Sequence, residues 1–451
     1  MRPLFFVGCL VALLLQSGCG YLPGDEPGKI IIRLATWGGA EDTDSDFNQT
    51  IRGLWREFER ENPGVVIREE KIPGSKEYVS KMLLSFVAGT EPDIMSLDAS
   101  SAAIFIENGV LKDLRPLIDK DPEFKLDDYY ENAVKIASRG EKVYAIPGDF
   151  TPMVVYYNRK LFDEAGVPYP RDNWTYDDFI EKAKKLTIPE KQQWGFKFDN
   201  WMPGWIVWLW NTGGDVLGTP SPFSDDRAAN GEGAGGGEIR ADGAFNSPES
   251  IAAIQFLADM VNVHKAAPTL GQVASLGVNP FLDGKAAMAA SGHWEMVGIQ
   301  AAKNIELQDI GIAPWPSGKG RLTTDNQQPT TTTVMYEAGF AMARRSKNPD
   351  VAWKFIKFLT SRRYQSVYQK TGIAICARKD VSQERAKGNP LEQKFLQIVP
   401  TARAPWGASV EGYDYVETEG PKMMDRVLAG GDVKKELDEA VRRIDGYFKI
   451  K

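Results

Sequence analysis

Strand-like and helix-like segments alternate regularly along residues 29–98, and this alternation constrains the fold more than any other feature of the sequence. The segments are, in order, strand 29–36 (KIIIRLAT), helix 47–58, strand 65–68, helix 79–87 and strand 92–95. The strands are β-branched runs without helical spacing, and the helices carry their apolar side chains on one face. A βαβαβ order predicts a mainly parallel, right-handed α/β sheet with ligands beyond the carboxyl ends of its strands.

Two groups of residues follow such strand ends directly. Trp37, Gly38 and Gly39 come after the first strand, and Asp98 comes after the third. Their position alone makes them candidates for contact with a ligand. The alternatives are that Trp37 belongs to the core and that Asp98 caps the helix that follows it.

The alternation continues through the rest of the chain. Residues 144–147 and 154–157 read as strands, and Thr175 with Asp178 forms the capping pair of a helix. Ser247-Pro248 and Asn348-Pro349 each open a further helix.

The N-terminus has the features of an export signal. One charge, Arg2, precedes an apolar stretch at 4–15, which is too short to span a bilayer but fits a signal peptide. The stretch ends in LQSGC, which resembles a bacterial lipobox whose Cys19 is lipidated. We therefore expect a signal peptide at 1–18. Gln16 departs from the usual apolar residue and leaves a plain secretory signal as the alternative.

A short linker follows the lipobox. Residues 19–28 are rich in proline, glycine and charge and read as a lipidated tether. Cys376 is then the one remaining ordinary thiol, so the sequence predicts no internal disulfide. A lipid-anchored globular body outside the cytoplasm is the expected arrangement.

The composition excludes several classes of function. The formal net charge is −7 without a basic run, which argues against nucleic-acid binding. Two histidines and three cysteines leave little for zinc or for Cys/His catalysis, so we expect neither a metal nor a cofactor. In contrast, the chain holds 12 tryptophans, which supply flat apolar faces.

Residues 221–243 form the most biased segment, with many glycines and few apolar side chains. Its Asp225, Asp226, Asn230 and Glu232 loosely suggest calcium, but their spacing matches no EF-hand. A solvated surface loop is the favoured interpretation.

Eight short segments, taken together and in this order, resemble the extracellular solute-binding proteins of family 1. These include the sugar-binding lipoproteins and maltose-binding-type proteins that feed bacterial ABC importers. The segments are 35–39 (ATWGG), 58–65 (FERENPGV), 89–94 (GTEPDI), 109–114 (GVLKDL), 144–147 (YAIP), 155–162 (VYYNRKLF), 281–288 (FLDGKAAM) and 291–294 (SGHW).

The resemblance implies a two-lobe periplasmic-binding-protein-like α/β fold. Each lobe is then a mainly parallel sheet flanked by helices, and a ligand in the cleft between them closes the lobes by hinge motion. We expect the chain to cross between lobes near Gly148, Thr330 and Cys376. The implied boundaries are 29–148 and 325–376 for lobe 1, and 149–324 and 377–451 for lobe 2. Residues 371–378 depart from the family's Pro-containing turn, so the third crossing is expected to differ in conformation.

By position in the family motifs, the ligand contacts carried over are Trp37, Gly38, Gly39, Asp98 and Trp294. Asp149 and Phe150 follow the 144–147 segment at the first crossing, and Asp149 has a turn-forming role as its alternative. Glu337 lies beside the second crossing as a ligand acceptor or a hinge change.

Aromatic rings elsewhere are further candidates. Trp201, Trp205 and Trp208 share one helical face, which is more typical of a core, although Trp208 or Trp210 is also a candidate for the cleft edge. Trp406 lies in a turn-rich stretch where relatives often supply a stacking ring.

These features favour a monomeric, non-enzymatic receptor that delivers a sugar or oligosaccharide to the permease of an ABC importer. Sugars stack on aromatic rings and bond to planar polar groups, and the tryptophan excess fits both. The alternatives are a secreted carbohydrate-active enzyme with paired carboxylates, or the same receptor fold binding a phosphate ester, polyamine or peptide.

Overall fold

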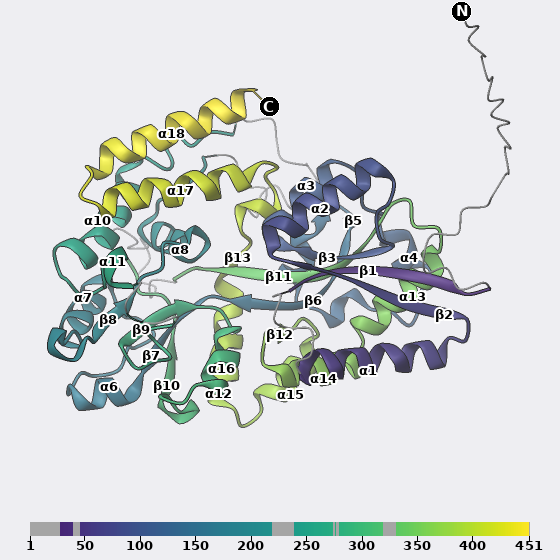
Figure 1. Cartoon of the computed structure of the whole chain (residues 1–451), viewed down its shortest axis with the longest axis horizontal. Helices are drawn as coiled ribbons and strands as arrows, with labels where there is room; N and C mark the ends of the chain where they lie inside the picture. Colours follow the sequence, from purple (N-terminus) through teal and green to yellow (C-terminus); the bar gives the residue numbers. More distant parts are fainter. Residues whose placement is uncertain are drawn as a thin grey trace, which may run out of the picture.

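Two β-sheets, each covered by helices, organise the chain (Figure 1). The computed structural model describes residues 28–38, 46–218, 239–273, 276, 279–318 and 331–450. The expected signal peptide, Cys19, Gly39, Thr330 and most of the 221–243 loop lie outside the described residues. None of the described helices is long and apolar enough to cross a membrane.

The first part of the large sheet follows the alternation in the sequence. Strands β1 (Ile30–Gly38), β2 (Val65–Pro73) and β3 (Ile94–Asp98) pair in parallel with β1 in the centre. Helices α1 (Asp46–Glu61) and α2 (Ser75–Ala88) connect them, and α2 ends at Gly89, whose φ of 71° only glycine adopts readily. The βαβαβ prediction is confirmed.

The large sheet is completed by strands that arrive from elsewhere in the chain. They are β6 (Ala145–Pro152), β11 (Thr333–Met342), β12 (Ile375–Cys376) and β13 (Ala402–Arg403). Strand β11 pairs antiparallel with both β3 and β6, and β6 pairs antiparallel with β12. The sheet is therefore mixed, because β11 runs in the opposite direction to the first three strands.

The small sheet has the order β10-β7-β9-β8. Its strands are β7 (Val154–Asn158), β8 (Trp194–Lys197), β9 (Ala286–Ser291) and β10 (Ile310–Ala313). Strands β8 and β9 are parallel, and β7 is antiparallel to both of its neighbours. We call the body around the large sheet lobe 1 and the body around the small sheet lobe 2. A separate hairpin joins β4 (Ser138–Arg139) to β5 (Lys142–Val143).

The remaining helices surround these sheets. They are α3 (Ala102–Glu107), α4 (Arg115–Asp119), α5 (Glu131–Ile136), α6 (Arg159–Glu164), α7 (Tyr176–Lys185), α8 (Met202–Thr212), α10 (Pro248–Asn262), α11 (Leu270–Val273), α12 (Glu295–Ala301), α13 (Pro349–Leu359), α14 (Arg362–Tyr368), α15 (Lys379–Ala386), α16 (Pro390–Ile398), α17 (Tyr413–Leu428) and α18 (Val433–Ile450). The capping pair of Thr175 and Asp178 is present as expected, and Ser247 caps α10.

The two lobes meet along the β6–β11 pair. Strand β6 lies in the large sheet and continues through Met153 into β7 of the small sheet. The register between β6 and β11 shifts at Ala338/Gly339, which places Gly148 in a bulge. A bulge bends a strand locally, and this one lies at the position where a crossing between the lobes is predicted. The predicted crossing near Gly148 and the lobe boundaries stay predictions.

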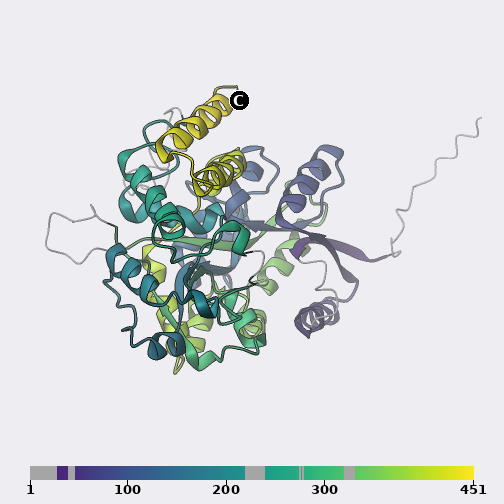
Figure 2. The ribbon, with the colours of Figure 1, turned by 60° about the vertical axis from the view of Figure 1, so that its left-hand side comes forward.

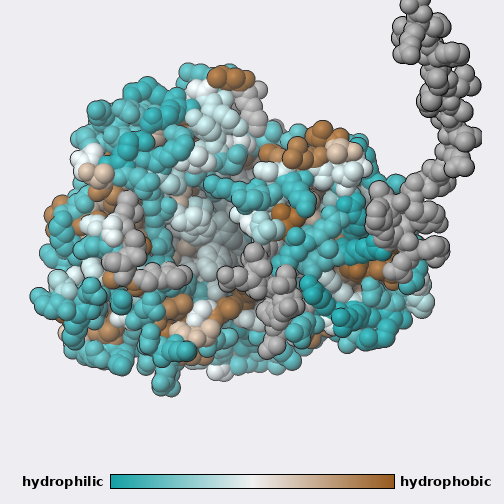
Figure 3. All heavy atoms as spheres, in the orientation of Figure 1, coloured by the Kyte–Doolittle hydropathy of each residue, from teal (hydrophilic) through white to brown (hydrophobic). Residues whose placement is uncertain are grey.

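Helix α17 borders the larger of two cavities described below, and α18 packs against α17. Helix α17 packs on α8, α10 and α18, and Figures 1 and 2 show it on the same side of the molecule as α2 and α3. Hydrophilic residues cover most of the face shown in Figure 3, and the hydrophobic patches there are small and scattered.

Cys376 ends β12 inside lobe 1. Its side chain is buried, and the thiol donates to the backbone oxygen of Gln365 at 3.2 Å. Burial raises the pKa of this thiol well above its usual value, so it stays protonated.

Candidate functional site

Two adjoining cavities, of 460 Å³ and 800 Å³, lie between the lobes. Both are lined by Trp37, Asp98, Trp294 and Tyr336, so they form one cleft with a shared neck. We call them the smaller and the larger chamber. The first three of these residues are sequence-predicted site residues from two different lobes.

The larger chamber is open between α2 of lobe 1 and α17 of lobe 2. Aromatic rings dominate its wall, and serines and carboxyl groups accompany them. The lining side chains beyond the neck include Ser75, Lys76, Tyr78, Ser100, Ser101, Trp201, Tyr413, Asp414 and Glu417. Flat apolar faces mixed with a few polar groups are the usual composition of a small-molecule site.

Trp294 is held by the tight turn that follows β9. The ring lies against Gly292, where an added Cβ would come within 2.4 Å of it, so only glycine fits there. Tyr156 donates its hydroxyl hydrogen to the Gly292 carbonyl at 2.9 Å. The His293 backbone N–H donates to Thr151 Oγ1 at 2.5 Å, which ties the turn to β6.

The imidazole of His293 anchors this turn through its two ring nitrogens. It is fully buried, with Nδ1 2.9 Å from the Gly372 carbonyl oxygen and Nε2 3.1 Å from Glu392 Oε1. Arg385 binds the same carboxylate at 2.7 Å. Both ring nitrogens of His293 therefore bind protein groups, and the residue supports the neighbouring Trp294 structurally.

Five aromatic rings line the neck and its rim. Trp294 lies 6.1 Å from both Trp201 and Tyr336, centroid to centroid, and Trp201 lies 5.9 Å from Tyr336. Opposite them, Trp37 meets Tyr78 edge to face at 5.4 Å. Rings from both lobes therefore offer faces to a ligand in the cleft.

Asp98 combines capping with lining of the cleft. One of its oxygens accepts from the Ser100 backbone N–H at 2.8 Å, as the capping alternative predicts. The residue also lines both chambers. Burial raises the pKa of Asp98, and the hydrogen bonds from Ser100 oppose the shift.

Asp149 lies in the smaller chamber, where it accepts a hydrogen bond of 2.5 Å from the Tyr368 hydroxyl. Burial raises its pKa to about 7, opposed by that hydrogen bond and reinforced by Asp98. Glu337 also lines this chamber at 2% exposure, and neither of its carboxyl oxygens has a hydrogen-bond partner. Burial, then the charges of Asp149 and Asp98, raise the pKa of Glu337 well above its usual value.

Four expected cleft residues lie in the packed interior instead. Phe150 is fully buried and packs edge to face on Tyr130 at 5.0 Å. It follows Asp149 on a strand, so the two side chains leave the sheet on opposite faces. The expectation that Phe150 faces the cleft is wrong.

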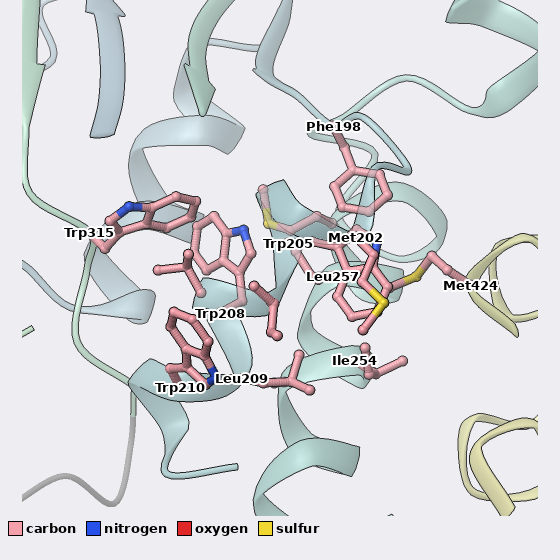
Figure 4. Close-up of a cluster of buried hydrophobic side chains, with 14 of the residues drawn as sticks. Phe198, Met202, Trp205, Trp208, Leu209, Trp210, Ile254, Leu257, Trp315 and Met424 are labelled. Atoms are coloured by element: carbon pink, nitrogen blue, oxygen red, sulfur yellow. The ribbon is translucent and has the colours of Figure 1, made fainter. Parts of the chain in front are cut away.

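The same correction applies to Trp208, Trp210 and Trp406, which are at most 5% exposed. Figure 4 shows Trp208 and Trp210 on α8 within a cluster that includes Trp315. Trp210 and Trp406 both donate their indole N–H to Asp215 Oδ1, at 2.9 and 2.7 Å. These rings stabilise lobe 2, and neither chamber is lined by them.

Sequence reasoning missed several lining residues. Trp201 is 44% exposed at the N-terminal end of α8, whereas Trp205 and Trp208 are buried. The exposure of Trp201 could have been inferred, because a residue that precedes the first turn of a helix need not lie on the buried face of that helix. Tyr336, Tyr413 and Glu417 carried no such signal. Gly38 ends β1 beside the neck residue Trp37, and Gly39 lies outside the described residues.

The chain is similar to several known proteins. The multiple sugar-binding protein of Streptococcus mutans is 24% identical over 77% of this chain and 76% of its own length. The galactooligosaccharide-binding protein of Bacillus subtilis is 22% identical over 90% of this chain and 89% of its own. An ABC substrate-binding protein of Listeria monocytogenes, solved with cycloalternan, superposes with a TM-score of 0.77 at 21% identity, covering 94% of this chain and all of that one.

The structural likeness confirms the two-lobe α/β fold with a cleft between the lobes. The model of the family described as bacterial extracellular solute-binding protein matches residues 44–366, which is most of the chain. The chain therefore belongs to the bacterial extracellular solute-binding protein family.

Proposed function

We propose that this protein binds a sugar or oligosaccharide in the interlobe cleft and delivers it to the permease of an ABC importer. The observation that carries the proposal is the neck, where Trp37 from lobe 1 and Trp294 from lobe 2 line the same cavity as Asp98. Relatives named for sugar binding, and a neighbour solved with cycloalternan, support the same ligand class.

The chemistry of the cleft suits a carbohydrate. A pyranose ring presents C–H faces that stack on indole and phenol rings, and its hydroxyls bond to carboxyl and hydroxyl groups. The larger chamber supplies both kinds of group, with Tyr78 and Tyr413 beside Ser100, Ser101 and Glu417. Binding proteins make up the family, so the enzyme alternative is not favoured.

A thermal-shift screen of mono- and oligosaccharides tests the proposal. Ligand at about 100 times its Kd stabilises the folded protein by about 2.7 kcal/mol, which a melting curve resolves readily. Chromatography of the same mixtures checks for cleavage. A melting temperature that no sugar raises, or the appearance of cleaved products, contradicts the receptor function.

We expect ligand to close the two lobes about the connections near Gly148, Thr330 and Cys376. The rings of the neck come from both lobes, so a sugar contacts both faces only when they approach. Small-angle scattering with saturating sugar should give a smaller radius of gyration than without it. An identical radius at saturation contradicts closure.

We further infer that the protein is a monomer held at the outer face of a cell membrane, or in the periplasm, by a lipid on Cys19. This rests on the lipobox-like LQSGC at 15–19. Cys19→Ala should move the protein from the membrane fraction to the soluble fraction, which immunoblotting of fractionated cells measures. Cys9→Ala, in the apolar part of the signal, is the matched control and should leave it in the membrane fraction. Unchanged membrane association of Cys19→Ala contradicts the anchor.

A further inference from the structure

We propose that the sugar ligand carries a protonated amino group and that this group binds at the neck, against Asp98 and the surrounding rings. The inference rests on the proposed function, because it specifies the ligand class of the same cleft. It is carried by the charges and the ring faces that line the two chambers.

The neck combines one carboxyl group with three aromatic rings. Asp98, Trp37, Trp294 and Tyr336 line both chambers, and among the described residues no basic side chain lines both. Aromatic faces carry negative electrostatic potential and attract a cation placed over them. A neutral sugar can stack on these rings and bond to the carboxylate through its hydroxyls, but an ammonium group gains in addition from the negative potential of the rings and from the charge of the carboxylate.

Further acids lie on each side of the neck. Asp149 and Glu337 line the smaller chamber, and Glu417 lines the larger one. The charge of Asp98 acts on all three. Carboxyl groups from both lobes are therefore gathered around one point, and closing the lobes would bring Glu417 of α17 closer to the three carboxyl groups of lobe 1.

Among the described residues, each basic group that lines the chambers belongs to one chamber and does not line the neck. Arg52 approaches Glu69 at 3.8 Å, so its charge is shared with a carboxylate outside the neck. Lys71 lines only the smaller chamber. Lys76 lines the larger chamber and attracts Glu417, but burial, Asp98 and Asp414 outweigh it and raise the pKa of Glu417 to about 8.

Glu337 provides the independent observation. It is 2% exposed, it lines the cleft, and both of its carboxyl oxygens lack a hydrogen-bond partner. A buried carboxyl group without a partner costs free energy, which a donor brought by the ligand offsets. Among the described residues no group of three or more acids, histidines or cysteines is arranged to hold a metal ion. An organic cation is thus the fitting partner for this chamber.

The sign of the pH dependence follows from the same groups. Asp149 and Glu417 have pKa values of about 7 and about 8 without ligand, mainly because burial disfavours their charged forms. An ammonium group prefers the ionised carboxylates, so its binding expels protons from them. Affinity for an amino sugar should rise from about pH 5.5 to about pH 7.5 and fall once the amine itself loses its proton.

The test is calorimetric titration with matched pairs of sugars that differ only by an amino group in place of the hydroxyl group on a sugar unit. Glucosamine with glucose, galactosamine with galactose, and chitosan oligomers with cello-oligomers are suitable pairs. In at least one pair we expect the amine to bind about tenfold more tightly at neutral pH, with a ratio that shrinks at about pH 5.5. Neutral sugars that bind as tightly as their amines overturn this inference alone. A panel in which no sugar binds overturns the proposed function and this inference with it.

Asp98→Asn locates the effect at the neck. Asparagine keeps an oxygen that can accept from the Ser100 backbone N–H, so the cap is retained while the charge is lost. The amine-to-hydroxyl affinity ratio should fall at least about fivefold, because the ammonium group loses a charged acceptor. Glu190→Gln removes an exposed acid that lines neither chamber and should leave the ratio unchanged. An unchanged ratio in Asp98→Asn, with a normal melting temperature, overturns the assignment.

Discussion

Trp294→Ala should weaken sugar binding at least about tenfold and leave the melting temperature of the ligand-free protein within a few degrees of the parent. The ring lines both chambers and is only partly buried, so we expect a sugar to contact its open part. Loss of such an aromatic anchor costs on the order of 1–3 kcal/mol of binding free energy, or roughly 5- to 150-fold in Kd. Calorimetric titration measures the affinity.

A thermal melt of the same variant without ligand serves as its control. If Trp294 were a core residue, its removal would cost about 3–5 kcal/mol of the free energy of unfolding. A collapsed melting temperature with near-normal affinity would therefore contradict its role in the site. Gly292→Ala gives an independent check, because the added Cβ would come within 2.4 Å of the ring and displace it.

Trp208→Ala should lower the free energy of unfolding by about 3–5 kcal/mol, which is the usual cost of a large cavity in a packed core. Trp208 is 1% exposed and packs against Trp315 at 5.0 Å, Phe179 at 5.0 Å and Phe256 at 5.1 Å. Figure 4 shows this crowding on α8. Urea unfolding followed by circular dichroism measures the loss.

Trp208→Phe is the graded control, since a smaller ring leaves a smaller cavity and should lie between the parent and the alanine variant. Where Trp208→Ala remains folded, its affinity for sugar should stay close to that of the parent. An unchanged unfolding midpoint combined with lost sugar binding would show that Trp208 touches the ligand after all.

The fold of lobe 1 was predictable because its first three strands and two helices are consecutive in the sequence. The first strand begins with the β-branched run Ile30–Ile32, and Gly89 marks the end of α2. The antiparallel additions were not predictable from local pattern. Strand β11 joins β3 across more than two hundred residues, and nothing local in its sequence specifies that direction.

The candidate site was predictable where position on a strand determines it. Trp37 and Asp98 end neighbouring parallel strands, and Trp294 follows a strand of the other lobe, so all three reach the neck. The predictions for Trp208 and Trp406 were wrong because the sequence does not show which face of an apolar segment is covered by the rest of the protein. Helix α8 is packed almost all around, and of its tryptophans and the preceding Trp201 only Trp201 lines the cleft.

Because Cys376 is buried and protonated, the expected lobe motion can be followed with dyes attached to introduced cysteines. A buried, protonated thiol reacts slowly with thiol-directed dyes, and a chain starting at Lys29 contains neither Cys9 nor Cys19. Cysteines placed at exposed Lys81 on α2 and exposed Lys435 on α18 would then be the fast-reacting positions, one on each lobe. Energy transfer between two dyes at these positions would follow opening and closing in single molecules, with the native thiol left in place.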